Sequence, residues 1–197
     1  VVRLRESFKD ASYQTRKPRT VKGSLAPTFI IGFPRSGTTL LDTILRSHPM
    51  IEVIEEKPIV DTVVANLRDI VDQRAITGLS KNTLDSLKEI YIAELEKLSS
   101  NYKSKKVIID KFPLNLIHAP LINRIFPDAK FILMLRHPCD CVLSCFMQNF
   151  ELNEAMVNFL DLNTTAKLYS NIMELWSVYS KNINMNLEIV KYEDLIY

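Results

Sequence analysis

The sequence has few cysteines, and they are crowded together. Of 197 residues three are cysteines, and Cys139, Cys141 and Cys145 lie in one short segment. An odd number of closely spaced cysteines is a poor disulfide framework, so we expect a reducing compartment and a cytoplasmic protein. A metal site would need a fourth ligand, and only His137 lies nearby. We therefore expect no metal and interpret the cysteines as small, partly buried helix residues.

Net charge and long apolar runs are also scarce. The 25 Lys and Arg residues and 23 Asp and Glu residues leave a net charge of +2. This charge is too small to imply a nucleic-acid partner, although it permits local basic sites for anionic ligands. Apolar runs such as residues 28–33 and 131–135 are far shorter than the ~20 residues of a membrane-spanning helix. We expect neither a nucleic-acid partner nor a membrane span.

The N-terminal segment differs in composition from the rest of the chain. Residues 1–26 carry many more basic than acidic side chains and no sustained apolar period. We interpret them as a solvated basic linker or the end of a preceding domain, although a basic arm can also touch an acidic partner. The chain begins at Val1 and stops at Tyr197, directly after a strand-like run. We expect both ends to be boundaries of a fragment, with one main domain over residues 27–197.

Strand-like and helical patterns alternate from residue 27 onward. The β-prone runs are 28–33, 51–54, 106–110, 129–135 and 187–192. Helical periodicity covers 38–47, 59–74, 83–98, 114–125, a segment after Pro138, and 162–180. Strands that alternate with helices form right-handed crossovers. The pattern predicts an α/β, P-loop-like three-layer fold, with a mostly parallel sheet and helices on both faces.

The most specific motif follows the first strand. It reads Gly32-Phe33-Pro34-Arg35-Ser36-Gly37-Thr38-Thr39. A strand that runs through a glycine-bounded loop into a helix presents backbone N–H groups and a helix dipole to an anion. The spacing matches a P-loop, but Thr38 replaces the lysine of nucleotide triphosphatases, while Arg35 supplies a cation earlier in the loop. The alternative is an ordinary turn capped by Ser36 or Thr38.

The segment Pro34 to Thr39 resembles the 5′-phosphosulfate loop of sulfotransferases that use 3′-phosphoadenosine 5′-phosphosulfate as donor. Residues 27–49, 110–115 and 148–150 resemble bacterial sulfotransferases often linked to tetratricopeptide repeats and, more distantly, tyrosylprotein sulfotransferase. The resemblance covers roughly residues 27–197. It implies this donor as co-substrate, no metal, and a possible preceding repeat domain. It also implies a C-terminal truncation, because family members carry a further loop after the last strand.

The resemblance also implies which residues bind the donor. The 5′-phosphosulfate site would consist of Arg35, Ser36, Gly37, Thr38 and Thr39. Arg136 and Ser144 match an arginine and a serine, eight residues apart, that grip the 3′-phosphate. Without the resemblance this spacing is weak, because Arg136 could pair with a surface acid and Ser144 could bond to its own helix. Tyr192 matches a tyrosine that lies near the adenine in the family. The alternative is that Tyr192 is an aromatic residue of the hydrophobic core.

Sulfuryl transfer requires a base and fixed cations. Glu55 and Glu56 follow a short strand, and repulsion between them could raise one pKa toward a useful value. By resemblance to tyrosylprotein sulfotransferase, Glu56 is the catalytic base and Lys111 assists departure of the nucleotide. We count Arg35 as the third catalytic residue. The alternatives are a solvated loop for the two glutamates and an ion pair between Lys111 and its neighbour Asp110.

One position departs from the family pattern. Pro58 stands where tyrosylprotein sulfotransferase has an arginine that grips its substrate, which makes peptidyl tyrosine a doubtful acceptor. The expected activity is sulfuryl transfer to a hydroxyl or amine of a carbohydrate, small molecule or peptide. Two alternatives stay open: a P-loop kinase or nucleotidase, and a non-catalytic nucleotide-binding module.

Overall fold

The sheet is parallel throughout and has the first strand at its centre. The computed structural model describes residues 1–8, 26–67, 76–99, 104–151 and 155–197. The strands are β1 (Thr28–Gly32), β2 (Ile51–Glu55), β3 (Val107–Lys111), β4 (Lys130–Leu135) and β5 (Asn186–Lys191). They form a five-stranded sheet in the order β2-β3-β1-β4-β5, in which each neighbouring pair is parallel. The predicted parallel sheet is confirmed.

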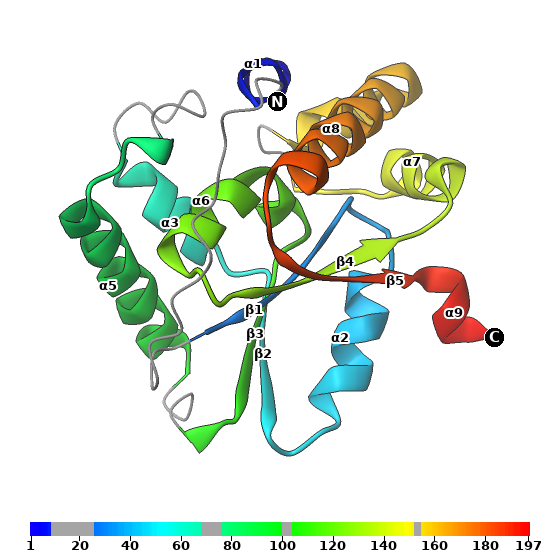
Figure 1. Cartoon of the computed structure of the whole chain (residues 1–197). Helices are drawn as coiled ribbons and strands as arrows, with labels where there is room; N and C mark the ends of the chain where they lie inside the picture. Colours follow the sequence, from blue (N-terminus) through cyan, green and yellow to red (C-terminus); the bar gives the residue numbers. More distant parts are fainter. Residues whose placement is uncertain (9–25, 68–75, 100–103, 152–154) are drawn as a thin grey trace.

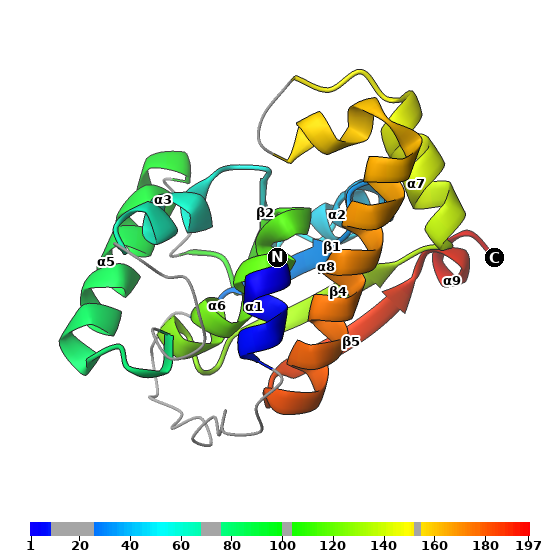
Figure 2. The same ribbon diagram turned by 90° about the horizontal axis from the view of Figure 1, so that it is seen from above.

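Helices cover both faces of this sheet (Figures 1 and 2). The α-helices are α1 (Val2–Ser7), α2 (Thr38–Arg46), α3 (Ile59–Ala65), α5 (Lys81–Leu98), α6 (Ala119–Ile125), α7 (Pro138–Met147), α8 (Leu162–Asn182) and α9 (Tyr192–Ile196). Two 3₁₀ helices, η2 (Pro113–His118) and η3 (Met156–Leu160), precede α6 and α8. Within the described ranges, none of the helices combines the length and apolar character needed to cross a membrane.

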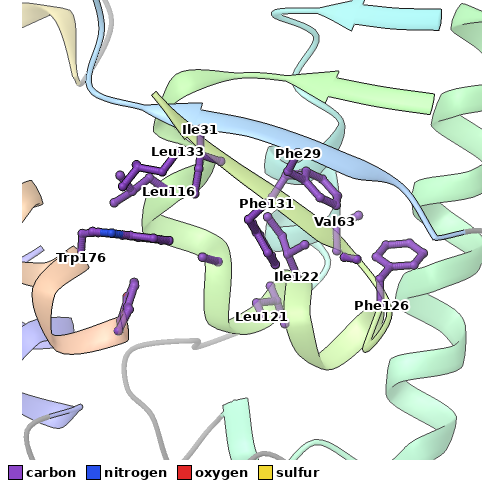
Figure 3. Packing of buried hydrophobic residues seen from close by; sticks show 14 of the residues in the cluster. Phe29, Ile31, Val63, Leu116, Leu121, Ile122, Phe126, Phe131, Leu133 and Trp176 are labelled. Atoms are coloured by element: carbon purple, nitrogen blue, oxygen red, sulfur yellow. The ribbon is translucent and has the colours of Figure 1, made fainter. Parts of the chain in front are cut away.

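The core lies on both sides of β1, whose five residues are all buried. Alternate side chains of a strand point to opposite faces. Phe29 and Ile31 therefore join the larger cluster under α3, α5, α6 and α8, which Figure 3 shows around Phe131. Ile30 faces the other way and packs with Leu41 of α2. The continuous apolar run of the sequence thus marks a strand that is buried on both faces.

Two predicted helices have different limits in the structure. The helix expected over 59–74 is helical only to Ala65, and residues 68–75 lie outside the described part. The helix expected over 114–125 is divided into η2 and α6. Pro120 explains the division, because proline lacks the N–H for an interior helical bond and is tolerated in a first turn.

The first residues pack on the domain, whereas the sequence predicts a solvated linker. Phe8 is fully buried, and its ring meets that of Tyr179 of α8 edge to face at 4.9 Å. The side-chain amide of Asn182 donates to the backbone oxygen of Phe8 at 2.9 Å. The apolar side chain at the end of a short helix therefore outweighs the basic composition around it. Residues 9–25 lie outside the description, and the domain boundary at residue 27 stays a prediction.

Candidate active site

A cavity of about 730 Å³ lies at the carboxyl edge of the sheet. Residues that follow each of the five strands line it, which is where parallel α/β sheets bind ligands. Its lining residues are Pro34, Arg35, Gly37, Thr38, Thr39, Leu40, Glu55, Glu56, Phe112, Pro113, Leu114, Arg136, Phe150, Glu151, Met156 and Tyr192. Most of the predicted site residues therefore meet at one cavity. Three predicted residues, Ser36, Lys111 and Ser144, lie behind or beside this lining.

The loop between β1 and α2 requires unusual backbone angles. Gly37 has φ 101°, and a Cβ atom there would lie 2.4 Å from a ring carbon of Tyr192, so only glycine fits. Arg35 has φ 67°, a conformation that costs free energy in a non-glycine residue and often occurs at functional sites. The first N–H groups of α2 have no intrahelical acceptor. The loop thus directs backbone donors and an arginine toward the cavity.

The side chain of Arg35 is held by α7. Its Nε atom donates to the Ser144 hydroxyl at 2.9 Å. The thiol of Cys145, one residue further, donates to the backbone oxygen of Pro34 at 3.4 Å. Ser144 therefore accepts from the loop arginine and does not bond to its own helix, which was the alternative to a role at a 3′-phosphate.

Arg136 lies on the other side of the loop. Its guanidinium carbon lies 4.5 Å from the centre of the Tyr192 ring, and Nη1 donates to the backbone oxygen of Arg35 at 3.4 Å. Its Nε atom is 3.4 Å from a carboxylate oxygen of Asp140, the surface acid that the alternative interpretation required. Tyr192 begins α9 and is half-buried against the loop. The roles of Arg136, Ser144 and Tyr192 toward a nucleotide stay predictions.

Lys111 joins the two glutamates. Its side chain is fully buried, and Nζ donates to Oε1 of Glu55 at 2.9 Å and to Oε1 of Glu56 at 2.8 Å. Parallel pairing of β2 with β3 sets Glu55 opposite Lys111, and the Glu56 N–H donates to the Lys111 oxygen at 2.8 Å. Glu56 also has a positive φ, 47°. A buried lysine therefore fixes both glutamates, whose side chains stay 44% and 55% exposed.

Glu55 does not follow the expectation that repulsion raises a pKa. The hydrogen bond from Lys111 lowers the pKa of the Glu55 carboxyl, and the charge of Arg46 acts in the same direction. Arg46 lies 3.4 Å from Glu55 and also pairs with Asp42, one turn earlier on α2. The cations nearby outweigh the neighbouring carboxylate, so Glu55 stays ionised at neutral pH.

Asp110 forms a buried network that the sequence analysis missed. The Tyr91 hydroxyl donates to one of its carboxyl oxygens at 3.0 Å, and the Asn115 amide donates to the other at 3.3 Å. Burial raises the pKa of Asp110 to about 7. Neighbours on a strand point to opposite faces, so strand alternation already argued against an ion pair between Asp110 and Lys111.

The cysteines differ from one another in exposure. Cys139 is exposed, which the expectation of partial burial did not foresee, whereas Cys141 and Cys145 are buried. Burial raises the pKa of Cys141 to about 11 and that of Cys145 to about 12, so both stay protonated thiols at neutral pH. Within the described ranges no group of three His, Cys, Asp or Glu side chains is placed to hold a metal.

Apolar side chains form a further part of the cavity lining, called here the apolar wall. It consists of Phe112, Pro113, Leu114, Phe150 and Met156. Residues 110–115 and 148–150 resemble family segments in the sequence, whereas nothing in the sequence singles out Met156. The signal for it is weak, because Met156 meets Phe112, Pro113 and Leu114 at this cavity only through the fold.

Comparisons with known proteins identify relatives of this chain. The family model described as the sulfotransferase family matches residues 27–197. An uncharacterized protein of Aquifex aeolicus is 32% identical over 78% of this chain and 21% of its own length. Protein-tyrosine sulfotransferase 1 of Homo sapiens is 30% identical over 55% of this chain and 30% of its own length. The chain thus spans between a fifth and a third of the length of these relatives.

Solved structures show the same fold. A sulfotransferase of Alicyclobacillus acidocaldarius covers 87% of this chain, with TM-score 0.51 and 16% identity over 74% of that structure. The sulfotransferase domain of the Synechococcus PCC 7002 olefin synthase covers 93% of this chain, with TM-score 0.50 and 21% identity over 71% of that structure. Because these sequence identities are low, the two structures show only that the fold is shared. The family model, which spans residues 27–197, shows that the chain belongs to the sulfotransferase family.

Proposed function

We infer that this chain transfers a sulfuryl group from 3′-phosphoadenosine 5′-phosphosulfate to a hydroxyl or amine acceptor. The observation that carries the proposal is the contact between buried Lys111 and Glu56, at the same cavity as the loop arginine, Arg35. One cavity thereby holds a carboxylate for the acceptor and cations for the leaving group.

The donor fits the cavity in size and charge. Small-molecule sites typically measure about 300–1,000 Å³, and this cavity has about 730 Å³. The loop would hold the 5′-phosphosulfate with the backbone N–H groups of Gly37, Thr38 and Thr39 and the guanidinium of Arg35. Ser36 would add a hydroxyl that is buried and makes no hydrogen bond among the described residues. Arg136, Ser144 and Tyr192 would bind the 3′-phosphate and adenine end.

The reaction needs positioning, one proton transfer and charge stabilisation. The acceptor oxygen forms a bond to sulfur while the bond from sulfur to the 5′-phosphate oxygen breaks. The proton of the acceptor passes to the Glu56 carboxylate, and 3′-phosphoadenosine 5′-phosphate leaves. Lys111 and Arg35 supply the positive charge that stabilises this leaving phosphate.

Nucleotide choice separates this function from a P-loop kinase or nucleotidase. We expect 3′-phosphoadenosine 5′-phosphate to bind more tightly than ATP with Mg²⁺ in calorimetric titrations, because Thr38 replaces the P-loop lysine. Tighter binding of ATP with Mg²⁺ would contradict the sulfotransferase assignment.

The base is tested with a matched pair of variants. Glu56→Gln keeps the shape of the side chain and removes its basicity, so transfer of labelled sulfate should fall by about 10²–10⁴-fold. Nucleotide affinity should stay unchanged. Glu55→Gln alters the other partner of Lys111 and should cost at least about tenfold less. Equal losses in the two variants, or an active Glu56→Gln protein, would remove Glu56 from the role of base.

A further inference from the structure

A second hollow adjoins the cavity on its apolar side. It has a volume of about 380 Å³ and shares Phe150 and Met156 with the first cavity. Its apolar lining comes from the end of α7, the following segment and η3: Phe146, Met147, Phe150, Met156, Phe159 and Leu160. The two shared side chains make the hollow an extension of the reaction cavity.

The hollow has an exposed apolar rim and an anchored floor. Met147 and Leu160 are 73% and 65% exposed, unusually high values for large apolar side chains. Phe159 is buried, and its ring lies 5.3 Å from that of Phe150 and 6.0 Å from that of Phe33. Contiguous exposed apolar surface beside a cleft is typical of a binding site. The anchored floor and exposed rim suit a ligand that covers Met147 and Leu160.

The charges around the hollow select against anionic ligands. Gln148 and Asn149 are its only polar lining residues among those described, and neither is charged. The carboxylate of Glu151, which follows Phe150 in the chain, lines the first cavity. An acidic peptide or an anionic polysaccharide would therefore meet apolar surface and a negative charge, and no cation among the described lining residues of the hollow.

We propose that this hollow binds the apolar part of the acceptor, which is an uncharged hydroxyl compound with an aryl or alkyl group. The proposal rests on the proposed function, because it takes Glu56 as the group that receives the acceptor's proton. Seated between Phe150 and Leu160, the apolar part leaves the hydroxyl free to extend past Met156 into the first cavity. Burial of apolar surface then supplies most of the acceptor affinity.

The test uses 2-naphthol as the apolar probe and a variant of the exposed rim. In Met147→Gln/Leu160→Gln both substituted side chains are mostly exposed, so the fold should persist. Calorimetric titration in the presence of 3′-phosphoadenosine 5′-phosphate should show the Kd for 2-naphthol raised about tenfold, with nucleotide affinity unchanged. The matched control is Val157→Gln, since Val157 lies on η3, is 52% exposed and does not line the hollow. It should change neither affinity.

Acceptor selectivity gives the second readout. With labelled donor, kcat/KM should be higher for 2-naphthol than for an acidic tyrosine-containing peptide or an N-acetylglucosamine oligosaccharide. Preference for either of these, or an unchanged Kd for 2-naphthol in the rim variant, overturns the proposal. So does rim-dependent binding to phosphatidylcholine vesicles without binding of 2-naphthol, which identifies a lipid surface instead. A protein that binds 2-naphthol in a rim-dependent way but does not bind the nucleotide would contradict the proposed function. The apolar binding site would still be supported.

Discussion

The carboxyl group of Asp110 is buried beside the end of β3 and has a pKa of about 7, far above its ordinary 3.8. Between these values the folded protein binds a proton that the unfolded chain has released, so this group makes stability fall as pH rises from about 4 to about 7. Because this carboxyl group binds at most one proton, it can change the free energy of unfolding by no more than about 1.4 kcal/mol per pH unit.

Replacing Asp110 with asparagine should remove this slope. The amide can still accept from Tyr91, but it carries no titrating proton. We expect the free energy of unfolding of Asp110→Asn, relative to wild type, to increase between pH 5 and pH 7.5. Urea denaturation at several pH values measures the difference, with Asp85→Asn on the exposed face of α5 as control. Wild-type and Asp110→Asn curves that stay parallel would contradict the raised pKa.

Lys111 allows stability and activity to be separated. Its two partners, Glu55 and Glu56, have side chains 44% and 55% exposed, so water can solvate both carboxylates when the ammonium is removed. Lys111→Met should change the free energy of unfolding by no more than about 1 kcal/mol. Sulfuryl transfer should fall by about 10²–10³-fold, because the leaving phosphate loses a fixed cation.

A lysine elsewhere in the fold provides the comparison. Lys97 pairs with Glu94 on α5, at a distance from the cavity lining. Lys97→Met should leave both stability and transfer close to wild type. A Lys111→Met protein with wild-type transfer rates, measured with labelled donor, would show that the lysine is structural only.

Among the elements, α1 offers the clearest test of packing. Phe8, at its end, is fully buried against Tyr179, so Phe8→Ala removes the contact that docks the helix on α8. We expect a loss of up to about 3 kcal/mol, the lower end for buried aromatic truncation, because a terminal helix can detach without opening the core. Urea denaturation measures the loss, and hydrogen exchange should show residues 2–8 deprotected.

The same helix supplies its own control. Val2 is 50% exposed, and Val2→Ala should leave the free energy of unfolding nearly unchanged. If Phe8→Ala and Val2→Ala behave alike, α1 does not contribute to the stability of the domain.

The strands could be predicted from the sequence because each carries its own apolar run, and their limits agree with the structure to within a residue or two. The β1–α2 loop could also be predicted, because its glycines, its hydroxyl residues and Arg35 lie in one short stretch of sequence. The contact of Lys111 with Glu55 and Glu56 could not be predicted in this way, because it depends on the pairing of β2 with β3, and α3 and α5 lie between these strands in the sequence. Docking of Phe8 likewise depends on a partner at the far end of the chain.

At the scale of the whole molecule, the proposed nucleotide site joins parts from most of the chain. A ligand that binds only the folded state at a hundred times its Kd stabilises it by about 2.7 kcal/mol. We expect this increase with 3′-phosphoadenosine 5′-phosphate and none with ATP and Mg²⁺ at the same concentration. Thermal and urea unfolding measure it. Stabilisation by ATP alone would contradict the nucleotide assignment.

The contact of Gly37 with Tyr192 also bears on how the protein is made. The loop near the start of the sheet packs on a ring near the end of the chain. A ribosome adds about 5–20 residues per second, so the loop waits on the order of ten seconds for this partner to emerge. During that interval β1 and its apolar neighbours have no finished sheet to enter, which makes the nascent chain a candidate client for chaperones. Nucleotide binding would then report that the chain as far as Tyr192 has been made and has folded onto the loop.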